Sequence, residues 1–194
     1  MAFQGIVRPQ PCPKFSRQIM AKSAESEGER PIETQRPSIV LYQPDIAGNT
    51  GAILRIAACF GLTVEIIEPA GFDSSARALK RAGMDYAAMA TLRRHDDFAA
   101  FRQDMAVRHG RLVLLTTSSE IAYTNFAFRS SDRLLFGRES AGVPEEVHGL
   151  ADARLTIPMV NGARSLNLAV SAGIVAAEAL RQLSPRQNRE LPIA

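Results

Sequence analysis

The sequence has no tryptophan, few aromatic residues and only two cysteines, Cys12 and Cys59, among its 194 residues. Two cysteines are too few for a disulfide framework or a thiolate zinc site, which indicates a reducing, cytoplasmic compartment. We expect Cys59, with its apolar neighbours, to pack as a small hydrophobic side chain. Because aromatic residues make up 6% of the chain, broad base-stacking platforms are not expected. No apolar run approaches the roughly 18 residues of a membrane-spanning helix.

Several common cofactor and nucleophile motifs are missing as well. No G-x-G-x-x-G or G-x-x-x-x-G-K-[ST] follows an expected strand, so an ordinary dinucleotide site and a P-loop are unsupported. G-x-S-x-G and H-E-x-x-H are also absent. The three histidines, His95, His109 and His148, do not have the spacing of metal ligands. The sequence therefore predicts no metal ion.

Charge is nearly balanced over most of the chain. The whole sequence has 23 basic and 20 acidic residues, so its net charge is weak evidence for a nucleic-acid partner. Residues 1–36 are rich in proline and small or charged residues, and we expect them to form a disordered tail. Basic residues without acidic ones in the first 24 positions resemble a transit peptide, although a plain extension is the interpretation we favour. A domain is expected over 37–184, followed by a short tail at 185–194.

From residue 38 onward, short apolar runs alternate with helix-type segments. Strands are expected at 39–42, 64–67, 112–116, 134–137 and 155–157. Helices are expected at 49–60, 75–82, 95–108 and 166–183. Asn49 or Thr50 should cap the first helix, and Gly61 should end it. Strands that alternate with helices predict an α/β fold with a mostly parallel sheet.

Three polar loops that each follow an expected strand are the candidate places for chemistry. They are the segments 49–55, 136–144 and 157–168. Ligands of open parallel sheets bind beyond the carboxyl ends of the strands, which is where these loops lie. Each loop alone also has a structural explanation, because Asn-Thr-Gly suits a helix start and Ser165 or Asn167 can cap the last helix. Their joint occurrence, in this order, favours a binding site.

The three loops resemble the three motifs of the SPOUT class of RNA methyltransferases. Further matches at 39–51, 67–72, 79–86 and 157–159 resemble one branch of that class, which methylates the ribose 2′-OH of the wobble nucleotide of leucine tRNAs. The resemblance covers about residues 38–183. It implies an α/β knot, with helices on both faces of a mostly parallel sheet and a C-terminal deep trefoil knot. True knots are very rare, so no argument from propensity predicts one.

The resemblance also implies a cofactor, S-adenosyl-L-methionine, bound in a bent form and held largely by backbone amides. The cofactor contacts carried over are Leu115, Gly137, Ile157 and Ser165, with Thr116, Glu139, Met159 and Leu166 as neighbours. The family works as a homodimer in which an arginine of one subunit completes the other subunit's pocket. The matching catalytic residues are Arg55, Ser165, Asn167 and Asn49.

Methyl transfer requires the ribose hydroxyl to be aligned with the methyl group at roughly 3 Å and to lose its proton. A guanidinium, with a pKa above about 12, does not ordinarily accept that proton. We therefore expect Arg55 to hold the adjacent phosphate and polarise the hydroxyl, while a second group or a substrate phosphate takes the proton.

A tRNA partner requires basic contacts, because no separate RNA-binding domain fits in this length. Residues 77–111 contain eight basic side chains and four aspartates. The candidate RNA contacts are Arg77, Lys80, Arg81, Arg93 and Arg94. For each of them an ordinary solvated helix face is the alternative. Other functions that stay open are methylation of rRNA or of another tRNA position, a catalytically idle RNA-binding factor on the same scaffold, and a small-molecule α/β enzyme.

Overall fold

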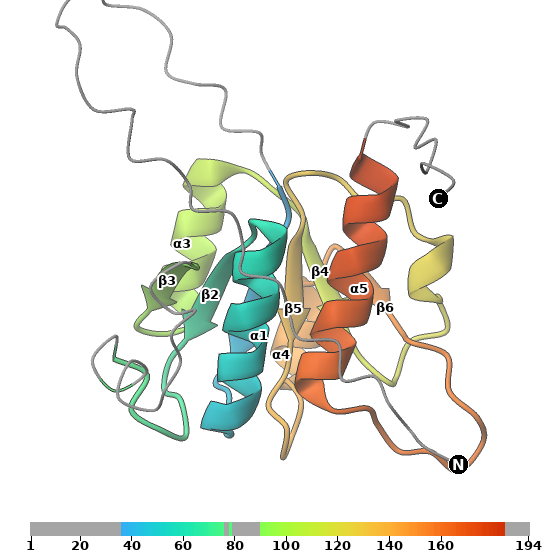
Figure 1. Ribbon diagram of the computed structural model, residues 1–194, viewed down its shortest axis with the longest axis horizontal. Helices are drawn as coiled ribbons and strands as arrows, with labels where there is room; N and C mark the ends of the chain where they lie inside the picture. The colour runs from blue at the N-terminus through green and yellow to red at the C-terminus, as the bar shows by residue number, and fades with distance from the viewer. Residues whose placement is uncertain (1–35, 76–77, 79–89, 185–194) are drawn as a thin grey trace, which may run out of the picture. The chain divides into compact units, whose positions relative to one another are not determined.

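The computed structural model describes residues 36–75, 78 and 90–184, which form a sheet flanked by helices (Figure 1). The strands are β1 (Ser38–Tyr42), β2 (Thr63–Ile67), β3 (Thr91–His95), β4 (Leu112–Leu115), β5 (Arg133–Phe136) and β6 (Ala153–Leu155). The helices are α1 (Ala47–Phe60), α3 (Phe98–Arg108), α4 (Glu145–Leu150) and α5 (Leu168–Leu183), with a 3-10 turn, η2 (Tyr123–Asn125). The expected tails at 1–36 and 185–194, apart from Arg36, and most of the expected helix at 75–82 lie outside the described residues.

All six described strands are parallel, in the order β3-β2-β1-β5-β4-β6. The central strand β1 is buried along its whole length, as expected for an apolar run covered on both sides. The α/β class with a parallel sheet is therefore confirmed. Since the strands share one direction, the segments that follow β1, β4, β5 and β6 all leave from the same edge.

Helices cover both faces of this sheet. Helices α1 and α5 lie side by side on one face (Figure 1), where Ile53, Leu54 and Val175 join the larger hydrophobic core. Helices α3 and α4 cover the other face, and Phe101 and Val147 belong to its core. None of the helices in the described part of the chain is long and apolar enough to traverse a bilayer. The threading of a C-terminal knot stays a prediction.

Helix α1 begins earlier than its sequence indicates. Ile46 precedes its first turn without a side-chain cap, so the prediction that Asn49 or Thr50 caps the helix is wrong. The Asn49 side chain is bonded to other loops instead, as described below. Gly61 ends the helix in the left-handed conformation (φ 65°), as predicted. Arg36 reinforces that end by donating to the Phe60 carbonyl at 2.6 Å.

The expected helix at 95–108 is shorter than predicted, because Asp97 caps α3 by accepting the Ala100 N–H at 2.8 Å. Residues 91–95 form the strand β3, which the sequence analysis missed. Its sequence, Thr-Leu-Arg-Arg-His, lacks an apolar run because it is the outermost described strand on its side of the sheet. Helix α4 and η2 lie in segments for which the sequence analysis predicted no helix. Cys59 is exposed, so the prediction that it packs as a hydrophobic side chain is wrong.

A buried polar cluster lies between the sheet and α3. Glu65 is 1% exposed and accepts hydrogen bonds from Ser38 at 2.7 Å and Arg133 at 3.3 Å, and it pairs with His95 at 2.8 Å. Arg133 also donates to Asp104 at 3.0 Å. The side-chain atoms of Glu65, His95 and Asp104 that could bind a metal ion lie within 4.8 Å of one another. However, the Arg133 guanidinium already supplies the positive charge between the two carboxylates.

Replacing Arg133 with methionine is expected to lower the free energy of unfolding by about 3–5 kcal/mol, because it leaves a buried carboxylate without its cation. Urea unfolding followed by circular dichroism measures this loss. The control is Arg108→Met, since Arg108 makes an exposed i,i+4 ion pair with the same Asp104 and should cost at most about 0.5 kcal/mol. Equal losses in the two variants would contradict the prediction.

Candidate functional site

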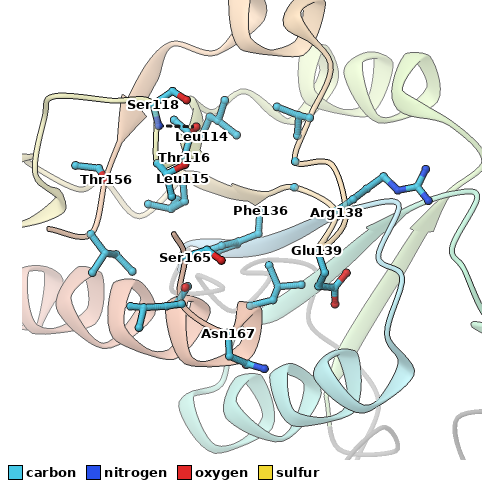
Figure 2. A pocket seen from close by; sticks show the side chains of 18 of the residues that line it. Leu114, Leu115, Thr116, Ser118, Phe136, Arg138, Glu139, Thr156, Ser165 and Asn167 are labelled. Carbon is cyan, nitrogen blue, oxygen red and sulfur yellow. Dashed lines mark hydrogen bonds between the residues drawn. The ribbon is translucent and has the colours of Figure 1, made fainter. Parts of the chain in front are cut away.

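A cavity of about 590 Å³ lies at the carboxyl edge of the sheet (Figure 2). Its lining comes from the segments that follow β4, β5 and β6, within 114–118, 136–143 and 156–159, and from the entrance to α5 at 165–168. Asn49 of α1 and His148 of α4 complete it together with Ile46 and Ser171. Segments far apart in the sequence therefore share one concave space of a size suited to a small-molecule ligand.

The cavity collects every position that the sequence analysis assigned to the cofactor. These are Leu115, Thr116, Gly137, Glu139, Ile157, Met159, Ser165 and Leu166. Two further predicted catalytic residues, Asn49 and Asn167, also line it. Arg55 is exposed on α1 and is not among the described residues that line the cavity of its own chain. The predicted convergence of the three loops is thus present, and the binding roles of these residues remain a proposal.

The loop after β5 is closed tightly by its own backbone. Arg138 and Gly142 exchange two N–H···O hydrogen bonds of 2.9 Å each, and Gly142 has a φ of 68°. A Cβ atom added to Gly137 would lie 2.5 Å from the Gly142 carbonyl carbon. Because no side chain fits there, glycine at 137 allows this loop to fold back against the cavity.

Asp45 holds the same loop against the segment between β1 and α1. Its carboxylate accepts hydrogen bonds from Arg138 Nη2 at 2.6 Å and from the Ser140 hydroxyl at 2.6 Å, with a further bond from the Ser140 N–H at 3.1 Å. The hydrogen bonds from Arg138 and then Ser140 lower the pKa of Asp45 to about 2. The segment between β1 and α1 is therefore joined to the second loop by an ion pair.

This ion pair predicts a pH dependence of stability. The pKa of Asp45 falls from 3.8 to about 2 on folding, so its contribution is fully present above pH 4 and is lost as the pH falls toward 2. We expect the difference in unfolding free energy between wild type and Asp45→Asn to shrink over that window. Denaturant titrations at several pH values between 6 and 2 measure it. A difference that stays constant with pH would contradict the assignment.

A second set of hydrogen bonds joins all three loops. Glu139 accepts from Asn49 Nδ2 at 3.0 Å and from the Asp45 N–H at 2.8 Å. Asn167 Nδ2 donates to Asn49 Oδ1 at 2.9 Å, while Asn167 Oδ1 accepts the Ala169 N–H at 2.9 Å and so caps α5. In Figure 2, Glu139 and Asn167 lie on the same side of the cavity. The cap on α5 confirms the structural alternative for Asn167 without removing it from the cavity.

The candidate RNA contacts are placed only in part. Arg77, Lys80 and Arg81 lie outside the described residues. Arg94 donates to Glu68 at 2.8 Å, and Arg93 is half-buried on β3. Burial alone would raise the pKa of Glu68, but hydrogen bonds from Ser74 and Arg94 outweigh it and lower the pKa. Arg94 therefore carries a charge that Glu68 already partly neutralises.

Some cavity residues were missed by the sequence analysis. Thr117, Ser118, His148 and Ser171 lie outside the three candidate loops, and Phe136 and Val143 lie in the second loop but had no assigned role. His148 had been set aside because the three histidines are scattered along the chain. Pro144 and the two glutamates that precede His148 are typical of a helix start. A helix at that position could have indicated that the imidazole returns to the cavity.

Comparison with known proteins agrees with this arrangement. The model of the SpoU rRNA Methylase family matches residues 36–177. A tRNA (cytidine(34)-2'-O)-methyltransferase of Beijerinckia indica is 54% identical over 145 residues, which are 75% of this chain and 91% of that protein. The corresponding enzyme of Escherichia coli K12 is 40% identical over 75% of this chain and 93% of its own length.

A solved structure described as "Structural insights into the 2-OH methylation of C/U34 on tRNA" is similar in fold as well as in sequence. It superposes with a TM-score of 0.71 and 45% identity, covering 77% of this chain and 97% of its own. Since the family model spans most of the chain and the curated relatives match along nearly their whole length, this chain belongs to the SpoU rRNA methylase family.

Proposed function

We propose that this protein methylates the ribose 2′-OH of the wobble nucleotide of tRNA, cytidine or modified uridine at position 34, with leucine tRNAs as substrates. The observation that carries the proposal is the convergence of three separate loops on one cavity lined by every expected cofactor position. The relatives that match over 91% and 93% of their length are named tRNA (cytidine(34)-2'-O)-methyltransferases. We expect the protein to act on this substrate in the cytoplasm.

The cavity fits S-adenosyl-L-methionine, the methyl donor that we assign to it. Leu115, Ile157 and Leu166 provide apolar walls, and Gly137 lets the backbone approach closely. The volume of about 590 Å³ lies within the range of small-molecule sites. When bound there, the sulfonium supplies a methyl group that is already activated, so this chain's residues mainly position the ribose and assist the loss of its proton.

The proposed active site needs a second subunit. Arg55 is exposed and lies outside the cavity lining of its own chain, whereas Asn49, Ser165 and Asn167 lie within it. Three large apolar side chains near the cavity and at the start of α5 are also exposed, namely Ile46 at 50%, Leu166 at 41% and Val170 at 50%. Burial of this surface against another copy, which would also supply Arg55, supports a homodimer.

The test is methylation of total tRNA by the purified protein with labelled S-adenosyl-L-methionine. We expect 2′-O-methylated cytidine or uridine in the anticodon fragment of leucine tRNA, detected by nuclease digestion and mass spectrometry. A product in rRNA or at another tRNA position would replace the substrate assignment. Absence of both product and S-adenosylhomocysteine binding, measured by calorimetry, would favour an idle RNA-binding factor.

A further inference from the structure

The Glu139 carboxylate is held by two donors from its own chain. Each carboxylate oxygen already accepts a hydrogen bond from the segment before or within α1, at 3.0 Å from Asn49 and 2.8 Å from the Asp45 N–H. Its side chain is half-buried between these donors. The sequence analysis predicts that Glu139 lies beside the cofactor, but it does not predict these two hydrogen bonds.

The polarity of the bonds determines how the two asparagine amides are turned. A carboxylate can only accept hydrogen bonds, so Asn49 must direct its NH₂ group to Glu139 and its oxygen away. That oxygen accepts Asn167 Nδ2 at 2.9 Å. At the other end, Asn167 Oδ1 accepts the backbone N–H groups of Ala169 and Val170. The orientation of Asn167 is thus fixed from both sides.

Each amide NH₂ group has two hydrogens, and one hydrogen of Asn167 is used by Asn49. Asn167 lines the cavity, and among the described residues its Nδ2 donates only to Asn49, which leaves the second N–H available to a ligand. A donor there suits an oxygen of the substrate ribose or of the adjacent phosphate. An amide turned the other way would present an acceptor and lose the bonds that cap α5.

We propose that Glu139 is a positioning residue. It sets the amide orientation of Asn49, and through Asn49 that of Asn167, so that Asn167 presents an N–H donor to a ribose or phosphate oxygen of the RNA. The inference rests on the proposed function. It gives Glu139 a different role from the residues that hold the cofactor, although all of them line the same cavity.

The first test is Glu139→Gln, which keeps the shape but replaces one acceptor with a donor. Either Asn49 or the Asp45 N–H then faces another donor, and Asn49 can turn over. We expect kcat for tRNA methylation to fall about 10- to 100-fold, as for misaligned reactants, with KM for tRNA and the dissociation constant of S-adenosylhomocysteine unchanged. Loss of S-adenosylhomocysteine binding would instead make Glu139 a cofactor ligand and overturn the proposal.

A second substitution restores the bonding pattern. Asn49→Asp alone places two carboxylates where an amide and a carboxylate now lie 3.0 Å apart, so this variant should also be impaired. Combined with Glu139→Gln, the new carboxylate at position 49 accepts from the new amide at position 139 and still accepts from Asn167. We expect the double variant to exceed both single variants in kcat. A double variant no better than either one would overturn the proposal.

Two measurements separate this inference from the proposed function. Wild-type protein that methylates no tRNA in the same assay would refute the function. The side-chain amide signals of ¹⁵N-labelled Asn167 report its orientation without any activity, and Glu139→Gln should shift them. The matched control is Glu145→Gln on α4, an exposed glutamate outside the cavity lining, which should leave both kcat and the Asn167 signals unchanged. Unchanged Asn167 signals in Glu139→Gln would overturn the inference.

Discussion

Replacing Arg55 with alanine is expected to lower the rate of tRNA methylation by about 100- to 1,000-fold, the usual cost of removing a group that stabilises developing negative charge. S-Adenosylhomocysteine binding should not change, because Arg55 is assigned to the RNA in the partner's site and lies outside the cavity lining of its own chain. Single-turnover methylation assays and calorimetric titration measure the two quantities separately. An equal loss of cofactor binding and of rate would contradict a role confined to the RNA side of the site.

Arg55→Lys distinguishes charge from shape. A guanidinium can hold a phosphate through two parallel hydrogen bonds, whereas an ammonium acts as a point charge. We therefore expect the lysine variant to bind tRNA nearly as well as wild type but to turn over far more slowly. Near-normal turnover together with normal tRNA binding would show that the fork geometry of the guanidinium is not required.

The substitution Gly137→Ala is expected to produce the other large effect, a loss of S-adenosylhomocysteine affinity. Its new Cβ atom would lie 2.5 Å from the backbone of Gly142, so the loop that closes on the cavity must move. Overpacking of this kind costs about 1–3 kcal/mol, which corresponds to an affinity loss of roughly 5- to 150-fold. Calorimetry measures the dissociation constant directly.

A matched control is available on α4. Gly149→Ala introduces the same methyl group where no atom lies within 4 Å of the new Cβ, and it should leave affinity unchanged. Melting temperatures of both variants show whether the domain remains folded. If Gly137→Ala bound S-adenosylhomocysteine as tightly as the control, the close backbone approach would have no part in shaping the site.

The two variants can also be combined to test the proposed dimer. In a mixed dimer, the intact pocket of the Arg55→Ala subunit would receive an intact Arg55 from the Gly137→Ala subunit. With random exchange, about half of the dimers are mixed and each has one complete site. Activity should therefore return to about one quarter of wild type. No recovery after confirmed subunit exchange would place the arginine and the pocket in the same chain.

The sequence predicted most of the sheet because its inner strands are predominantly apolar. Strands β1, β2, β4, β5 and β6 lie within two residues of their expected positions. The candidate site followed from the same pattern, because strands that run in one direction bring their carboxyl ends together. The roles of individual side chains came instead from the family resemblance, since a loop such as 157–168 has no periodicity to interpret.

The parts that were missed depend on contacts between distant residues. The charged strand β3 is recognisable only once β2 is beside it. The Asn49 side chain is a reasonable helix cap in isolation, but Glu139, ninety residues away, holds it elsewhere. His148 reaches the cavity only because α4 turns the chain back toward β4. Of these contacts, only that of His148 has a local signature, in Pro144 and the two glutamates that begin α4.

The arginines of the outermost strand bear on how two copies could meet. Among the described strands, β3 has a neighbour on one side only, and it carries Arg93 and Arg94. Positive charge on an exposed edge discourages another chain from adding a strand there. Extension of the sheet through β3 is thereby disfavoured, and helix surfaces remain a route by which two copies could associate.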